Sequence, residues 1–123
     1  MVWKERLIIA LDVNSAASAL TIVDRLGDDI AMYKIGFELF VSEGPTLVKQ
    51  ILARGKRVFL DLKFHDIPNT VAKAAVAAAR MGVSLFTVHA CGGFDMMRRM
   101  VESVDDVCSK EQCHRPKMIA VTL

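Results

Sequence analysis

Short runs of apolar and β-branched residues alternate along the chain with longer amphipathic or alanine-rich stretches. The short runs are typical of strands, and the longer stretches, whose apolar residues recur at helical spacing, are typical of helices. We expect strands at residues 7–12, 31–35, 57–63, 84–89 and 117–123. We expect helices at residues 15–26, 45–54, 69–81 and 94–109. These bounds are favoured by Asn14 or Ser15 as the cap of the first helix, by Pro68 at the start of the third and by Gly82 just past its end.

The predicted strands begin at residues 7, 31, 57, 84 and 117, which is the spacing of repeated strand–helix units. Such units produce parallel strands joined by right-handed crossovers. Unbroken apolar runs at residues 7–11 and 118–121 indicate strands buried on both faces. Two α/β architectures remain open: an open doubly wound sheet, which 123 residues can hold, and a (β/α)₈ barrel, which needs roughly 200 to 250.

The end of the sequence favours the second architecture. Residues 117–123 read as an apolar strand with no helix after it, whereas a finished open sheet more often ends in a covering helix. We therefore expect a TIM-barrel type of fold that is truncated after the fifth strand. Residues 1–123 would be the N-terminal part of a single (β/α)₈ barrel domain and would hold its strands 1 to 5.

Composition narrows the classes of function. Hydrophobic residues make up 53% of the chain and the net charge is +2, so we expect a packed core and no binding of nucleic acid or an anionic membrane. No apolar run approaches the roughly 20 residues of a membrane span, and the N-terminus lacks a secretion signal. The three cysteines indicate reduced thiols in a cytoplasmic protein. Cys108, Cys113 and His114 lack a second ligand pair, so no metal site is expected.

Ionisable residues gather where the predicted strands end. They are Asp12, Lys34, Asp61, Lys63 and His89, with Asp66 in the loop after the third strand. The carboxyl ends of parallel strands share one edge, so we expect these side chains on one rim. Asp61 and Lys63 are two apart on a strand and should point to the same side. In such a cluster lysines and carboxylates keep one another charged, and a held ammonium can protonate a developing carbanion.

Structural roles remain open for several of these residues. A buried ion pair adds little stability, so a charged pair inside an apolar strand favours a functional role. Taken singly, however, each residue has an ordinary alternative: a helix cap for Asp66, a turn cap for Asp12, a side chain reaching to water for Lys34, a rim histidine for His89 and a structural ion pair for Asp61 with Lys63.

The run Asp61-x-Lys63-x-x-Asp66-Ile67-Pro68-Asn69-Thr70 resembles the orotidine 5′-phosphate decarboxylase family, in its bacterial form. The chain resembles the family's N-terminal half, with further matching stretches in the same order at Ile9-Ala10-Leu11-Asp12, Tyr33-Lys34-Ile35-Gly36 and Thr87-Val88-His89. The bare D-x-K-x-x-D is shared with related sugar-phosphate enzymes. The Ile-Pro-Asn-Thr that follows it points to the decarboxylase.

This resemblance implies a cytoplasmic homodimer that converts orotidine 5′-monophosphate to uridine 5′-monophosphate and carbon dioxide in pyrimidine biosynthesis, without metal or organic cofactor. Lys63 would protonate C6 of the pyrimidine, and Asp61 would lie near the departing carboxylate. Lys34 and Asp66 would complete the charged network. The substrate-binding residues would be Asp12 and Lys34 at the ribose hydroxyls, His89, and Ile67 and Thr70, which with Asp66 would enter the partner's site.

The resemblance also implies that a pyrimidine-binding serine turn and the phosphate-binding residues, including an arginine, follow the fifth strand. On this hypothesis the 123 residues alone bind the substrate weakly and are inactive. Two other functions remain open. One is a related D-x-K-x-x-D sugar-phosphate enzyme that uses Mg²⁺. The other is a non-catalytic half barrel that self-associates through its open strand edges.

Overall fold

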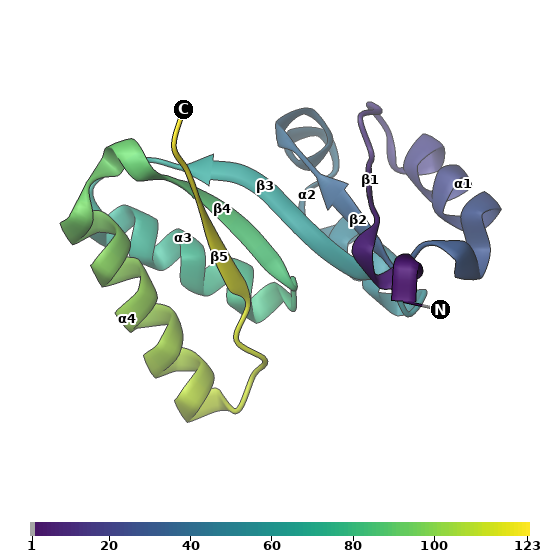
Figure 1. The fold of residues 1–123 in the computed structure, drawn as a ribbon. Coiled ribbons are helices and arrows are strands. Elements are labelled where there is room, and N and C mark those ends of the chain that lie inside the picture. Colours follow the sequence, from purple (N-terminus) through teal and green to yellow (C-terminus); the bar gives the residue numbers. More distant parts are fainter. Residues whose placement is uncertain (1) are drawn as a thin grey trace. The chain divides into compact units, whose positions relative to one another are not determined.

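The computed structural model describes residues 2–123, in which five strands alternate with four α-helices (Figure 1). In chain order these elements are β1 (Ile8–Ala10), α1 (Ala16–Leu26), β2 (Met32–Ile35), α2 (Phe37–Ala53), β3 (Arg57–Phe64), α3 (Pro68–Met81), β4 (Leu85–His89), α4 (Phe94–Glu111) and β5 (Lys117–Val121). Short 3₁₀ turns lie at Val2–Arg6, Gly27–Asp29 and Ala90–Gly92. The strand order is β1-β2-β3-β4-β5, and the chain forms a partial α/β barrel.

The chain divides into two compact units, one ending at Asp61 and the other beginning at Leu62. In the first unit β1 pairs in parallel with β2, and β2 with β3. Helix α1 begins where the sequence predicts, because the Ser15 side chain accepts a hydrogen bond of 3.2 Å from the Ser18 N–H. The unit's buried side chains come mainly from α1, β2, α2 and β3 and include Ala19, Val23, Tyr33, Ile35, Leu39, Leu47, Val48, Ile51, Val58 and Leu60.

Helix α2 differs from the sequence prediction. It begins at Phe37, eight residues before the predicted start at Pro45, and contains a kink at Gly44. Gly44 has a φ of 63°, which glycine adopts without strain, and Pro45 then opens the second helical segment. The prediction was wrong here because Gly44-Pro45 is also the usual signature of a helix start.

The hydroxyl of Tyr33 is fully buried in the first unit and has no hydrogen-bond partner among the residues that the structure describes. Burial also raises the pKa of Tyr33, because the phenolate would lose its hydration. An unpaired buried hydroxyl costs about 1–3 kcal/mol. We therefore expect Tyr33→Phe to raise the free energy of unfolding by about 1 kcal/mol, measured by urea unfolding. Unchanged or lower stability would mean that a bound water pairs the hydroxyl.

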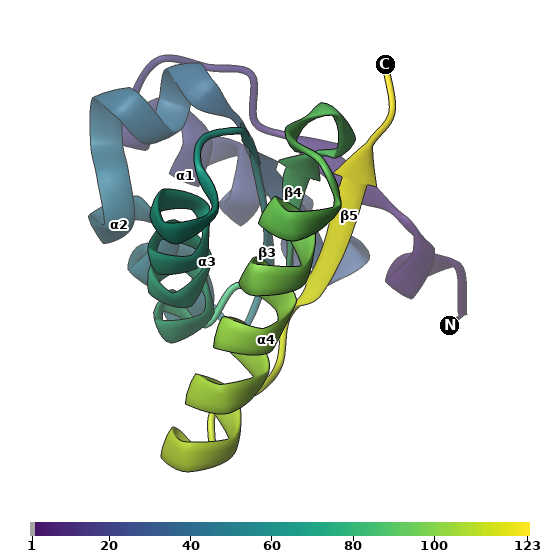
Figure 2. The same cartoon turned by 90° about the vertical axis from the view of Figure 1, so that its left-hand side faces the viewer.

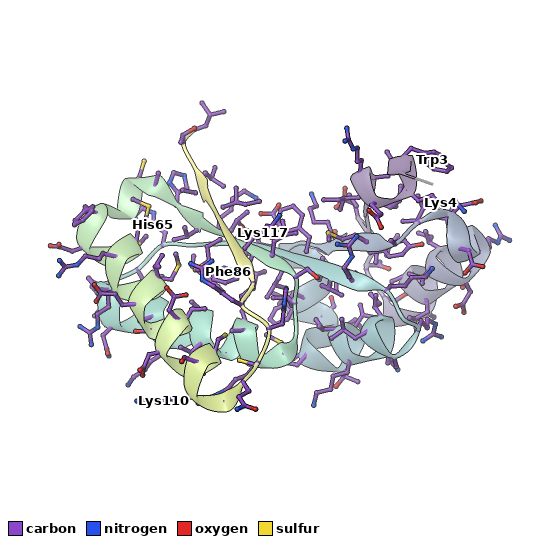
Figure 3. All side chains as sticks on the ribbon, turned by 60° about the horizontal axis from the view of Figure 1, so that its bottom comes forward. Trp3, Lys4, His65, Phe86, Lys110 and Lys117 are labelled. Atoms are coloured by element: carbon purple, nitrogen blue, oxygen red, sulfur yellow. The ribbon has the colours of Figure 1, made fainter. Side chains whose placement is uncertain are left out.

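In the second unit α3 and α4 lie side by side, and β4 pairs in parallel with β5 (Figure 2). Arg80 of α3 and Glu111 of α4 join the helices by an ion pair of 2.6 Å. Phe86, labelled in Figure 3, is fully buried, and its ring centroid lies 5.7 Å from that of Phe64. The helices contribute further buried side chains, among them Val71, Ala75, Ala78, Met96, Met100 and Val104.

The strands differ in how far they are buried, and the central strand β3 is fully buried only at Val58 and Leu60. The inner strands β2 and β4 are largely buried along their length. The prediction of two buried faces is wrong for β1 and β5, where Ile8 and Ile119 remain 44% and 43% exposed. Each of these two strands ends the strand order and has a neighbour on one side only, so fewer side chains cover it.

Candidate active site

In the first unit an ion pair lies at the carboxyl ends of the strands. Lys34, in β2, places its Nζ 3.7 Å from Oδ2 of Asp61, in β3. The register explains this approach, because Lys34 pairs with Phe59 and Asp61 lies two residues further along the same strand. The two side chains are 28% and 14% exposed, so water screens the pair less than it screens a surface pair.

Asp12 lies on the same edge of the first unit. It follows β1 directly after Leu11, whose N–H donates a hydrogen bond of 2.9 Å to the Lys34 carbonyl oxygen. Asp12 itself is exposed. The first unit therefore offers an exposed carboxylate and a partly buried ammonium–carboxylate pair at the ends of neighbouring strands, where they can bind hydroxyl groups and a charged substrate.

In the second unit the backbone of Lys63 is unusual. Lys63 lies near the end of β3 with a φ of 48°, a conformation that costs a residue with a side chain about 1 kcal/mol or more. Its N–H donates a hydrogen bond of 2.9 Å to the side-chain oxygen Oγ1 of Thr87 in β4. Residues in such conformations gather at functional sites. Because strand alternation assumes extended backbone, the shared direction of Asp61 and Lys63 stays a prediction.

Two histidines stack near these strand ends. The rings of His65 and His89 lie 5.4 Å apart between centroids at an interplanar angle of 25°. Nδ1 of His89 accepts a hydrogen bond of 3.2 Å from the Cys91 N–H, which orients the ring. His65 lies just beyond the end of β3, and the sequence pattern assigns it no role. His65 is labelled in Figure 3.

The loop after β3 does not cap α3 in the way the sequence alternative suggested. The cap position is held by Ile67, and Oδ1 of Asp66 instead accepts the Ile67 N–H at 2.7 Å. Ile67 is 64% exposed, and Thr70 in the first turn of α3 is also exposed. A pocket of about 540 Å³ opens beside them, lined by His65, Asp66, Ile67, Pro68, Cys91 and Gly92.

The predicted site residues are thus distributed over the two units. The structure brings Lys34 and Asp61 together in the first unit. It places Lys63, Asp66 and His89 at strand ends or the following loop of the second unit. A joint network of Lys34, Asp61, Lys63 and Asp66 stays a prediction. Within residues 2–123 no three His, Cys, Asp or Glu side chains form a group that could hold a metal ion, and no helix is long and apolar enough to cross a bilayer.

Comparison with known proteins gives consistent results. The model of the family described as "Orotidine 5'-phosphate decarboxylase / HUMPS family" matches residues 5–123. Curated proteins named orotidine 5′-phosphate decarboxylase are similar to this chain, with 49% identity over 120 residues for Geobacter metallireducens and 45% over 119 residues for Nostoc sp.. These alignments cover 98% and 97% of this chain and 49% and 50% of the relatives.

Solved structures agree with the sequence matches. An uncharacterized conserved protein from Geobacillus kaustophilus has a TM-score of 0.86 at 40% identity, over 94% of this chain and 54% of that one. An orotidine 5′-phosphate decarboxylase from Lactobacillus acidophilus has a TM-score of 0.85 at 38% identity, over 95% of this chain and 52% of that one. The chain therefore spans about half the length of the relatives that it matches.

Proposed function

Because this chain belongs to the orotidine 5′-phosphate decarboxylase / HUMPS family, we propose that it carries the charged catalytic part of a cytoplasmic enzyme of pyrimidine biosynthesis. The enzyme converts orotidine 5′-monophosphate to uridine 5′-monophosphate and carbon dioxide. The observation that carries the proposal is the family match over residues 5–123, together with the Lys34–Asp61 pair at the strand ends. Residues 1–123 form one part of a single barrel domain in this proposal.

The proposed chemistry is carried out by side chains of the protein, without a metal ion or an organic cofactor. The bond between C6 and the carboxylate carbon breaks, carbon dioxide leaves, and the electron pair stays on C6. The Lys63 ammonium stabilises this charge and then donates a proton to C6. Asp61 lies beside the departing carboxylate, so repulsion acts on the substrate and disappears as carbon dioxide forms. Interactions that are stronger in the transition state than in the ground state are those that accelerate a reaction.

The remaining residues bind and orient the substrate. Lys34 is held by Asp61 and, with Asp12, binds the ribose hydroxyls. Asp66 completes the charged network with Lys63. His89 lies at the end of β4, where its ring is held by the Cys91 N–H, and it contributes to substrate binding. Fixing a substrate by remote groups lowers the entropy cost of reaching the reactive geometry.

The proposed enzyme is a homodimer in which Asp66, Ile67 and Thr70 enter the partner's site. An exposed apolar Ile67 beside an open pocket supports this, because a partner subunit would cover it. We expect the active protein to sediment as a dimer at micromolar concentration, and Ile67→Asp to shift it towards monomer. A monodisperse monomer that is active would contradict this assembly.

The function can be tested with a joined polypeptide, in which residues 1–123 are followed by the C-terminal half of the Geobacter metallireducens relative. We expect release of carbon dioxide from carboxyl-labelled orotidine 5′-monophosphate, with an equal amount of uridine 5′-monophosphate formed, in the presence or absence of EDTA. The intact relative serves as the positive control. A folded joined polypeptide that makes no uridine 5′-monophosphate would overturn the proposal.

The chelator separates the decarboxylase from the second enzymatic candidate. The D-x-K-x-x-D run occurs in both, and the family description itself covers more than one group of enzymes. Activity that EDTA abolishes would favour the Mg²⁺-dependent sugar-phosphate enzyme. Ile67-Pro68-Asn69-Thr70 favours the decarboxylase.

A further inference from the structure

The C-terminal end of α4 brings two thiols into contact. Gln112, just past the helix, has a left-handed backbone with a φ of 55°. A residue in this conformation reverses the chain, so the residue after it packs against the last turn of the helix. Here that residue is Cys113, whose thiol donates a hydrogen bond of 3.0 Å to the sulfur of Cys108.

Other contacts hold the same turn. Asp105 of α4 forms an ion pair with Arg115, which lies beyond the turn. The Cys108 thiol lies 3.8 Å from the His114 carbonyl oxygen and donates to it. The helix cap and the chain that leaves it therefore place the two sulfurs together.

We propose that Cys108 and Cys113 form a site of reversible oxidation, at which a peroxide converts the two thiols into one disulfide. A disulfide bond is about 2.05 Å long, so the sulfurs have to approach by about 1 Å. Cys113 is half-buried and Cys108 is 7% exposed, so Cys113 meets the oxidant first. Burial, together with the Cys113 contact, raises the pKa of Cys108 to about 11, which makes Cys108 the less reactive of the two thiols towards the oxidant.

The reaction balances with hydrogen peroxide as the oxidant. The Cys113 sulfur attacks one peroxide oxygen and becomes a sulfenic acid, and the other oxygen leaves as water. The Cys108 sulfur then attacks the Cys113 sulfur, the sulfur–sulfur bond forms, and the sulfenic oxygen leaves as a second water with the Cys108 proton. The two thiols lose two electrons in total, which the peroxide takes up. A dithiol reductant reverses the step.

The test uses the 123-residue chain, hydrogen peroxide as the probe, and intact-mass and thiol measurements. The structure holds three free cysteines, Cys91, Cys108 and Cys113. We expect the oxidised chain to lose the mass of two hydrogen atoms and to retain one reactive thiol of three. Peptide mapping should join Cys108 to Cys113, and dithiothreitol should restore all three thiols.

Matched variants make the result specific. Cys91→Ser, which removes the exposed cysteine outside the turn, should leave the mass loss unchanged, and Cys108→Ser should abolish it. Gln112→Gly keeps the left-handed turn and should preserve disulfide formation, whereas Gln112→Val disfavours that turn and should slow it at least about tenfold. Addition of oxygen to Cys113 without a link to Cys108, or equal rates in the two Gln112 variants, would overturn the proposal.

A separate observation concerns Thr87. Thr87 lies in β4, and its polar side chain is buried, with 3% exposed. Its Oγ1 accepts a hydrogen bond from the N–H of Lys63, whose backbone is left-handed. We infer that Thr87 is a positioning residue, which holds the Lys63 backbone so that its ammonium points at the substrate. This inference rests on the proposed function.

Thr87→Val removes the acceptor at nearly constant shape, and Thr87→Ser keeps it. In the joined polypeptide we expect Thr87→Val to lower kcat per folded molecule at least about tenfold with KM little changed, and Thr87→Ser to restore it. In the 123-residue chain, amide exchange at Lys63 should be faster for Thr87→Val only. If the parent joined polypeptide is active and the Thr87→Val variant keeps its full kcat, the positioning role of Thr87 is overturned and the proposed function is unaffected. An inactive parent overturns the proposed function, and this role with it.

Discussion

Lys63→Ala is expected to lower kcat of the joined polypeptide by about 10⁴-fold or more. A positioned general acid contributes about 10²–10⁴-fold, and a fixed charge at the developing anion contributes about 10²–10³-fold. In the proposed mechanism Lys63 supplies both, so its loss removes the proton and the cation together. The measurement is single-turnover release of labelled carbon dioxide.

The matched control is Lys49→Ala, which removes an exposed lysine from α2. It should keep the parent rate, because a solvated lysine away from the strand ends does not contact the substrate. Circular dichroism should show both variants folded. If Lys63→Ala is folded and retains more than about a tenth of the parent kcat, Lys63 is not the proton donor.

The 123-residue chain by itself should release no measurable carbon dioxide. In the proposed function the phosphate-binding residues lie in the half of the relatives that this chain does not cover, and the chain covers 50% and 49% of two of these relatives. Binding energy from a remote phosphate holds and orients the reacting base, and enzymes that lose such contacts lose kcat as well as affinity. Addition of the separately expressed C-terminal half of the Geobacter metallireducens relative should restore turnover in proportion to complex formed.

The informative comparison is between the turnover of the free 123-residue chain and that of the joined polypeptide, at equal concentration. Turnover by the free 123-residue chain that matches the joined polypeptide would show that the phosphate site lies within these residues. Turnover that appears only when the C-terminal half is present, whether added or joined, would support the proposed division of the site. The Lys63→Ala variant of the 123-residue chain, mixed with the same C-terminal half, controls for contaminating activity in the preparation of that half.

The strand–helix order could be predicted from the sequence, because short apolar runs typical of strands alternate with longer stretches whose apolar residues recur at helical spacing. Helix α3 combines a proline in its first turn, an alanine-rich face and a glycine at its end, and its observed bounds differ from the prediction by one residue. The start of α2 was missed because the pair Gly44-Pro45 is compatible with a kink inside a helix as well as with the start of a helix. The exposure of β1 and β5 was missed because a hydrophobic run does not reveal how many neighbouring strands cover it.

Of the candidate site, the approach of Lys34 to Asp61 is confirmed, and the assembly and roles of the other residues stay a prediction. Parallel strands required Lys34 and Asp61 to lie near one edge, and the structure places them 3.7 Å apart. Nothing in the residue types of Lys63 or Gln112 indicates a positive φ, since neither lysine nor glutamine favours that region. The stacked His65 and His89 and the contact of Cys108 with Cys113 depend on turn conformations, which pattern analysis does not resolve.

The left-handed backbone at Lys63 bears on how this protein can be engineered. Judged by conformational energy alone, glycine or asparagine suits that position better than lysine. A stabilising design that ranks residues by backbone preference would therefore replace Lys63, gaining up to about 1 kcal/mol and discarding the proposed proton donor. In the proposed function this local loss of stability accompanies the ammonium group that acts on C6, so thermostability screens of this protein should hold position 63 fixed.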